Sequence, residues 1–372
     1  MFNKLVRFSL LIIMVSFISC SPKANIEEEK EAIIALMDSV YKAHFNKDAN
    51  AFYAPNAETW LDVRHGLITE THRKTQIENT QQYLDNMEFL ELEPQQEPVV
   101  NISKDGTMAS YVAAIHVKGR FQGQPVFWVI SWQSVFEKIN DEWKVISTAN
   151  TEAPTEASSK IILRNVSKAL GVLPEGSSLS AMANCVGPQG DLFQTLIFSE
   201  KTRGRMEQSN ERGHYVLSYE DSLIWSYNFV SKNLNEDAGE MTKSFIQGHE
   251  LHWLSLRPMD RTTRPLFKGF EEFKGTVSFK IESRDILDRP ILFYYSFEDY
   301  LPLGFQMETA PGQPPVVVSF ENWDSVGPYR VFKRAVFKQG DEVFQYEFTK
   351  INFNSMTEED FHIKNANLVF SE

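Results

Sequence analysis

The chain has 372 residues, with 37 Lys and Arg against 50 Asp and Glu and a formal net charge of −13. This acidic balance argues against nucleic acids and anionic lipid surfaces as electrostatic partners, because both require a basic face. The length suggests two or three domains, and two cysteines, Cys20 and Cys185, are too few for a disulfide framework.

The amino terminus has the pattern of an export signal. Lys4 and Arg7 precede an apolar stretch, residues 8–18, which ends just before Cys20. As a helix this stretch would span roughly 16 Å, too short for the ~30 Å hydrocarbon core of a bilayer. We therefore predict that residues 1–19 are a secretory signal peptide rather than a transmembrane helix.

The end of this segment, Phe17-Ile18-Ser19-Cys20, resembles a lipobox in which Phe17 replaces the usual Leu. The resemblance implies a diacylglyceryl group on Cys20, a tether over residues 20–25, and a lipid-anchored protein of the cell envelope. Ser21 in place of an aspartate favours the outer membrane, on its periplasmic side or at the cell surface. The alternative is an ordinary signal peptide followed by an incidental cysteine.

Residues 26–153 have the pattern of an α+β domain. Apolar residues at three- and four-residue spacing predict an amphipathic helix over 25–46, with Asn25 and Glu28 at its start. A weaker helix is expected over 73–87. Strands rich in β-branched and aromatic residues follow at 99–102, 110–117, 126–136 and 142–148. Helices followed by an antiparallel meander are typical of the α+β class.

Three segments carry a family resemblance: Phe45-Asn46-Lys47-Asp48-Ala49, Ala57-Glu58-Thr59-Trp60-Leu61-Asp62-Val63, and Phe136-Glu137-Lys138 with Glu142-Trp143-Lys144-Val145. The region resembles the SnoaL-like group of the nuclear transport factor 2 (NTF2) superfamily, to which ketosteroid isomerase also belongs. The resemblance implies a cone-shaped domain with helices on a curled sheet. That fold hosts isomerases, cyclases, dehydratases and plain binding modules, so it does not decide the function.

Acid/base chemistry in such a cone needs a titratable group held in apolar surroundings. The candidates are Asp62, His65 and His116, with Tyr111 as a proton donor. Against this, Asp62 and His65 lie in a polar segment that reads equally well as a surface loop, and His116 reads as solvent-facing. Trp128, on the aromatic face of its predicted strand, is a candidate to line the pocket.

Residues 154–159 have the small, polar composition of a linker, and residues 160–372 form the second predicted domain. A helix capped by Ser158 or Ser159 is expected to end at Gly171, followed by a helical or irregular piece over 179–185. From residue 191 onward, strands dominate, as in Phe344-Tyr346-Phe348. Nineteen of the 28 Phe lie after residue 190, so this sheet presents a large aromatic surface that a helix or a ligand must cover.

This region resembles the antiparallel half-barrel of the LolA/LolB lipoprotein carriers, with a helical plug, in the segments 288–296, 299–305, 317–324, 326–330 and 351–354. The resemblance implies a sheet curled around an apolar cavity. The candidate lining residues are Trp225, Tyr227, Trp253, Phe279, Phe293, Tyr295 and Phe320. The alternative is that they are ordinary core, since buried aromatic residues usually serve packing.

The run Gly248-His249-Glu250-Leu251-His252-Trp253 differs from a zinc-protease helix, in which the two histidines are four residues apart. Its flanks suggest a strand, on which His249 and His252 would point to opposite faces. We expect no metal site and no cofactor.

The favoured function is a membrane-anchored envelope lipoprotein that binds a lipid or another hydrophobic small molecule without catalysis. One alternative is a SnoaL-like acid/base enzyme of isomerase or lyase type. The other is a protein-interaction module that forms a homodimer through the cone domain. An aromatic, alternating sheet without a catalytic motif favours the first.

Overall fold

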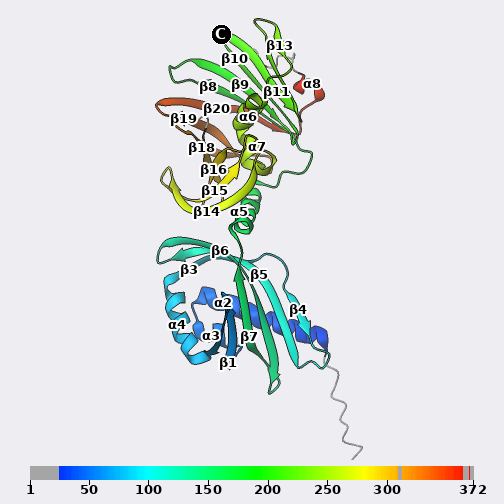
Figure 1. Cartoon of the computed structure of the whole chain (residues 1–372), viewed down its shortest axis with the longest axis vertical. Coiled ribbons are helices and arrows are strands. Elements are labelled where there is room, and N and C mark those ends of the chain that lie inside the picture. The colour runs from blue at the N-terminus through cyan, green and yellow to red at the C-terminus, as the bar shows by residue number, and fades with distance from the viewer. Residues whose placement is uncertain (1–24, 309–311, 363–367, 369–372) are drawn as a thin grey trace, which may run out of the picture. The chain divides into compact units, whose positions relative to one another are not determined.

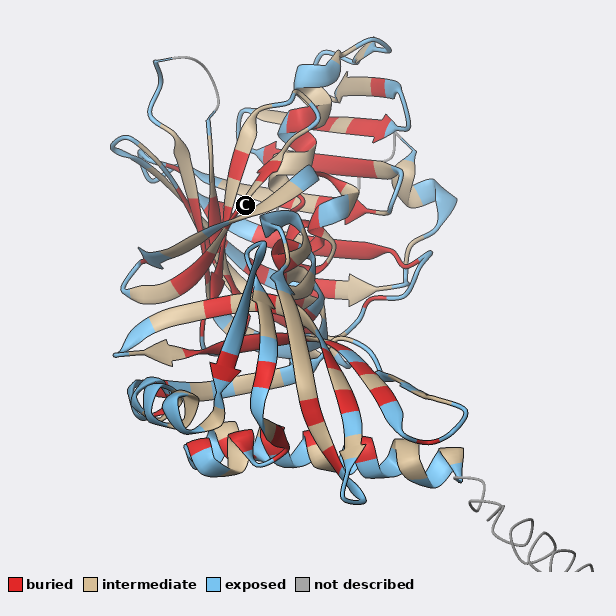
Figure 2. Ribbon diagram, turned by 60° about the horizontal axis from the view of Figure 1, so that its bottom comes forward, coloured by how far each residue is buried: buried red, intermediate tan, exposed pale blue. Residues whose placement is uncertain are grey.

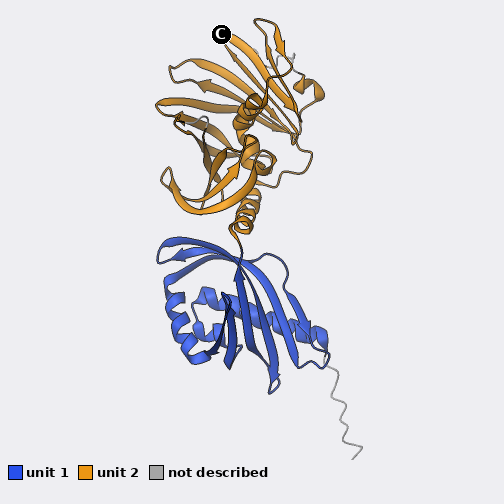
Figure 3. Ribbon diagram, in the orientation of Figure 1, with its two compact units in different colours: residues 1–153 blue, residues 154–372 orange. Residues whose placement is uncertain are grey.

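The computed structural model describes residues 25–308, 312–362 and 368. The chain divides into two compact units, residues 1–153 (unit 1) and 154–372 (unit 2), which Figure 3 colours separately. The predicted signal peptide, Cys20 and the tether up to residue 24 lie outside the described residues. None of the described helices is long and apolar enough to cross a membrane.

Unit 1 is a curled seven-stranded sheet with helices packed against it (Figure 1). The strand order is β2-β1-β7-β6-β5-β3, with β4 also on β5; all pairs are antiparallel except β1 with β7. The elements are α2 (Ile26–Asn46), α3 (Ala49–Tyr53), β1 (Asn56–Arg64), β2 (Leu67–His72), α4 (Arg73–Asn86), β3 (Met87–Pro94), β4 (Val99–Ile102), β5 (Met108–Phe121), β6 (Gln124–Ile139) and β7 (Glu142–Glu152).

Helix α2 supplies the apolar side of the unit 1 core, as its periodicity predicts. Ile33 and Met37 pack against Tyr111 of β5 and Phe136 of β6 in one buried cluster. The first turn differs from the prediction, because the Asn25 side chain makes no capping hydrogen bond. Glu29 instead accepts hydrogen bonds from Lys138 Nζ at 2.5 Å and Trp143 Nε1 at 2.7 Å, which tie the helix start to the β6–β7 hairpin.

The structure adds strands β1, β2 and β3, which the sequence pattern did not predict. The polar segment around Asp62 is a β-hairpin rather than a surface loop: Asp62 lies in β1, and His65-Gly66 form its turn with φ of 49° and 78°. Two residues at positive φ suit the right-handed twist of a hairpin. Strand β2 lies at the edge of the sheet and is mostly exposed, so no core imposes apolar alternation on it.

Unit 2 is one antiparallel sheet of 13 strands, ordered β13-β12-β11-β10-β9-β8-β20-β19-β18-β17-β16-β15-β14. Buried and exposed positions alternate along many of its strands (Figure 2). The elements are α5 (Thr155–Leu170), β8 (Leu179–Val186), β9 (Leu192–Ser199), β10 (Arg203–Asn210), β11 (Gly213–Glu220), β12 (Leu223–Asn228), β13 (Asn233–Asn235), α6 (Glu240–His249), α7 (Leu251–Leu256), η1 (Pro258–Asp260), β14 (Thr263–Phe273), β15 (Thr276–Arg284), β16 (Pro290–Ser296), β17 (Pro302–Met307), β18 (Val316–Val326), β19 (Tyr329–Gln339), β20 (Glu342–Phe353) and α8 (Glu358–Phe361).

Helices α6 and α7 lie within the curve of this sheet (Figure 1). Ile246 of α6 packs against Met206 and Tyr219 on strands β10 and β11. Every residue of α7 is buried, and the His252 ring stacks on Phe332 with 4.0 Å between ring centroids. The two helices are therefore the plug of the half-barrel.

Three local predictions in unit 2 need correction. Helix α5 begins at Thr155, within the range 154–159 predicted as a linker, and Pro154 rather than a serine occupies its N-cap. Residues 179–185, predicted to be helical or irregular, belong to strand β8, where they pair with both β9 and β20. The segment around His249 and His252 is helical, not a strand, because it forms the end of α6 and the start of α7.

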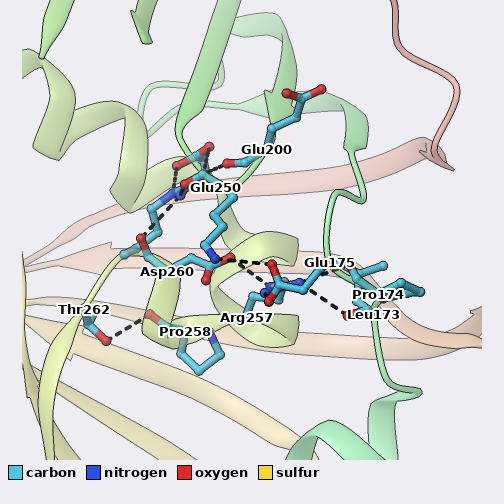
Figure 4. Close-up of polar contacts among 11 residues, drawn as sticks. Leu173, Pro174, Glu175, Glu200, Glu250, Arg257, Pro258, Asp260 and Thr262 are labelled. Carbon is cyan, nitrogen blue, oxygen red and sulfur yellow. Dashed lines mark hydrogen bonds and ion pairs between the residues drawn. The ribbon is translucent and has the colours of Figure 1, made fainter. Parts of the chain in front are cut away.

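A buried ion pair fixes the break between α6 and α7. The Arg261 guanidinium donates from Nε to Glu250 Oε2 at 2.6 Å and from Nη2 to Oε1 at 3.0 Å. Tyr219 donates to the same carboxylate at 2.9 Å, and Arg261 also donates to the carbonyl oxygens of Glu200 and Lys201. Figure 4 shows Glu250 and Glu200 in this network. A Cβ on Gly204 would lie only 2.5 Å from Glu250 Oε1, so the strand needs glycine there.

We predict that Arg261→Met destabilises unit 2 by about 3–5 kcal/mol, because it leaves the buried Glu250 carboxylate uncompensated. The free energy of unfolding of unit 2 is measured by urea-dependent hydrogen exchange of the α7 amides in the whole chain. The control is Lys268→Met, whose side chain is 47% exposed and 3.8 Å from Glu282; it should change stability by no more than about 0.5 kcal/mol. Equal effects of the two substitutions would contradict the role of the ion pair.

Candidate functional site

Unit 2 contains a cavity of about 550 Å³ between α6 and the central strands of the sheet. Its wall is mostly apolar and rich in aromatic side chains, and polar side chains from the hairpins β8–β9, β10–β11 and β19–β20 also border it. The aromatic lining residues are Phe193, Tyr215, Phe245, His249, Phe337, Phe344 and Tyr346. The hairpin residues include Asp191, Asn210, Lys338, Gln339 and Glu342. An apolar cavity with a few polar groups is the usual form of a small-molecule site.

The strand register brings the aromatic residues together. Phe337 of β19 is directly opposite Phe344 of β20, Tyr346 is opposite Cys185 of β8, and Cys185 is opposite Phe193 of β9. Directly opposed residues share a face of the sheet. Strand β8 therefore places a small side chain between Phe193 and Tyr346, whose rings meet edge to face with centroids 5.8 Å apart. Cys185 is buried, and burial raises the pKa of its thiol, so the residue packs as a small, protonated side chain.

Helix α6 closes the other side of the cavity with one of its faces. Met241, Ser244, Phe245 and Gly248 recur at three- and four-residue spacing, and all of them line the cavity. Gly248 leaves open space there, because an added Cβ would lie 3.8 Å from Met307 Sδ, an ordinary contact.

Arg289 connects α6 to the β15–β16 hairpin. Its guanidinium donates to Ser244 Oγ at 2.5 Å and lies 2.7 Å from the Asp285 carboxylate. The helical side of the cavity is thus held at this point as well as at Glu250.

None of the predicted unit 2 lining residues belongs to this cavity wall. Phe279, Phe293, Tyr295 and Trp253 are buried, and Phe320 stacks on Phe332 at 4.2 Å. Trp225 and Tyr227 are half-buried on β12. Sequence alternation did mark part of the real wall, since Phe344-Tyr346-Phe348 contains two of its residues. The lining residues on α6 were missed because that segment was assigned to a strand.

Unit 1 has a separate pocket of about 380 Å³ between α2 and the sheet. Trp128 lines it, as predicted, together with Trp60 and Trp132. His44 of α2, not predicted as a site residue, also faces it. Its Nδ1 donates to the Val40 carbonyl at 2.8 Å, and burial lowers its pKa below the usual 6.5, so the ring is neutral at neutral pH.

The three catalytic candidates do not come together. His65 lines the unit 1 pocket, but Asp62 is not in its wall; Asp62 pairs with Arg64 Nε at 2.7 Å and accepts from Thr148 Oγ1 at 3.0 Å. His116, expected to be solvent-facing, is buried and lies 3.1 Å from Glu91 Oε2. It alternates with Ile115 and Val117, which do line the pocket, so it lies on the other face of β5.

Tyr111, the proposed proton donor, is buried in the same unit. Its hydroxyl oxygen is 3.4 Å from that of Tyr41, and burial raises its pKa. Among the described residues, the structure shows no group of three or more His, Cys, Asp or Glu that could hold a metal ion.

No protein-family model matches the chain, and no curated protein matches it in sequence. Solved structures do. A LolA superfamily protein from Nitrosomonas europaea is 12% identical, with a TM-score of 0.42, over 55% of this chain and 97% of that one. A DUF1329 family protein from Desulfovibrio piger is 9% identical, with a TM-score of 0.41, over 56% and 98%. An NTF2-like protein from Cytophaga hutchinsonii is 16% identical, with a TM-score of 0.29, over 33% and 98%.

Both families that the sequence resembles are represented among the similar structures. The elements and strand order of the two units confirm the predicted α+β class with a cone and a half-barrel. At these identities and TM-scores, the likeness concerns the fold and carries no argument about function.

Proposed function

We propose that unit 2 binds one lipid chain or another hydrophobic small molecule in its cavity, and that the protein is a binding module rather than an enzyme. The observation that carries this proposal is the aromatic wall around about 550 Å³ of space. Ligand sites typically measure 300–1,000 Å³ and are mostly apolar. Each methylene group buried there would contribute about 0.8 kcal/mol, so a medium-length hydrocarbon chain offsets the cost of association.

The competing proposal, acid/base catalysis in unit 1, has weaker support. A general base needs a free carboxylate or imidazole within reach of the substrate. Asp62 is engaged by Arg64 and Thr148, and His116 lies on the other face of its strand from the pocket lining. Of the three catalytic candidates, only His65 lines the unit 1 pocket.

We further propose that the protein is held in the cell envelope by a lipid on Cys20, in the outer membrane. The support is the export-signal pattern before Cys20 and the lipobox-like run that ends there. A tethered chain would present its cavity at a fixed membrane rather than carry a ligand across the periplasm.

We predict that Gly248→Phe weakens binding of the fluorescent hydrophobe N-phenyl-1-naphthylamine at least about tenfold, because the ring would occupy the cavity. Gly248→Ala is the matched control, since its Cβ makes only an ordinary contact with Met307 and leaves the space open. The measurement is fluorescence titration of the chain from residue 21, which keeps every described residue. Unchanged affinity in a folded Gly248→Phe protein would exclude this cavity as the site.

For the anchor, we predict that cells expressing the full chain incorporate labelled palmitate into it and that Cys20→Ala abolishes the label. Cys185→Ala is the control, because that thiol is buried and should leave labelling unchanged. Label that persists in Cys20→Ala would contradict the assignment of the lipid to Cys20.

A further inference from the structure

The His249 imidazole is part of the cavity wall, and its hydrogen bonding fixes which nitrogen carries the proton. Nδ1 lies 2.8 Å from the backbone carbonyl oxygen of Phe245, one turn earlier in α6. A carbonyl oxygen can only accept, so Nδ1 is the donor. In the neutral ring, Nε2 is then a hydrogen-bond acceptor with a free lone pair.

The surroundings of the ring leave Nε2 facing the cavity. Phe245 and Phe337 pack against it, with centroids 4.3 and 5.3 Å away, and the Phe337 ring is stacked. Nδ1 is directed at the helix backbone, so the edge that carries Nε2 is the part left to border the cavity. Within the described part of the chain, Nε2 has no protein partner.

Tyr346 adds a second polar group to the same wall. Its ring centroid is 6.3 Å from that of His249, and its hydroxyl forms no hydrogen bond with any described residue. Burial raises its pKa well above 10, so the phenol keeps its proton. Burial also lowers the pKa of His249 below 6.5, so at neutral pH the wall presents a neutral acceptor beside a neutral hydroxyl.

The charged groups of the cavity are of mixed sign. Arg289 is paired with Asp285, and Lys338, Asp191 and Glu342 come from the hairpins. Because charges of both signs border the cavity, we infer that it does not select a charged ligand.

We propose that the cavity selects a hydrophobic molecule that carries a hydroxyl group, which donates to Nε2 of His249 and accepts from Tyr346. This rests on the proposed function of unit 2. A hydrocarbon without a donor would displace water from Nε2 and leave that acceptor unsatisfied, so it binds more weakly than its size allows. Sites that hydrogen-bond a ligand hydroxyl discriminate strongly against analogues that lack it.

The test uses two isomers of C₁₀H₂₂O, 1-decanol and methyl nonyl ether, of which only the alcohol can donate a hydrogen bond. Each displaces N-phenyl-1-naphthylamine from the chain starting at residue 21, at pH 7.5. For each protein we take the ratio of the affinity for the alcohol to the affinity for the ether. The quantity compared is this ratio in the unsubstituted protein divided by the same ratio in His249→Phe. Differences in hydration between the isomers cancel in this quotient. His249→Phe keeps an aromatic ring between Phe245 and Phe337 but lacks the acceptor.

We expect the quotient to be about tenfold in favour of the alcohol. Lys268→Met, on strand β14 outside the cavity wall, should leave the ratio of the two affinities unchanged. A quotient of one, with both isomers still bound, would overturn the inference and leave the proposed function intact. Failure of the dye and both isomers to bind the unsubstituted protein would overturn both. If His249→Phe does not fold, the 15N chemical shift of His249 Nε2 in the unsubstituted protein replaces it: the shift must change when the alcohol binds and stay unchanged when the ether binds.

Discussion

Glu250 and Arg261 form a buried ion pair at the break between α6 and α7, and the helical wall of the cavity is positioned by it. The cost of removing both charges from water is offset by the bidentate geometry, the Tyr219 hydroxyl and two backbone carbonyls. Those carbonyls belong to the turn between β9 and β10. The pair therefore fastens the plug to the sheet, and α6 is presented at a fixed distance from the strands opposite.

The cavity persists because the elements on its two sides are held apart by polar contacts. Protein interiors are normally packed to high density, so a space of this size persists only where its walls cannot collapse. Helix α6 contributes Gly248 to the wall, where even an added Cβ would make only an ordinary contact with Met307. Arg289 and Ser244 hold α6 to the β15–β16 hairpin, so the helix cannot fill the gap. The hydrogen bond from Nδ1 of His249 to the Phe245 carbonyl leaves Nε2 as a hydrogen-bond acceptor in this mostly apolar wall.

Much of the architecture could be predicted from the sequence, because apolar periodicity reports on a face that is buried along its whole length. Strands β5 and β6, in which buried positions recur along most of the strand, are of this kind. The edge strand β2 has little buried surface, and β8 carries small residues, so neither gives a clear period. The plug was misassigned because α6 and α7 are short and the second is buried on all sides, which removes the amphipathic signal.

The site itself was harder to predict, because alternation shows that a strand has two faces but not which of them is concave. Phe279 and Phe320 have the same alternation as Phe344 and Tyr346, yet they lie in packed core. In unit 1, Asp62 and His65 are close in sequence but differ in role, since a partner arginine two residues away engages Asp62. Only the three-dimensional packing of the strands against the plug helices shows which of these residues line a cavity and which lie in the core.

The most direct test of the account is native mass spectrometry of the chain from residue 21, purified without detergent from a bacterial periplasm. The account predicts a bound mass that is lost on denaturation, that belongs to a hydrophobic molecule bearing a hydroxyl group, and that is absent from Gly248→Phe. A ligand-free mass that persists after incubation with fatty alcohols and phospholipids would contradict the claim that this cavity is a binding site.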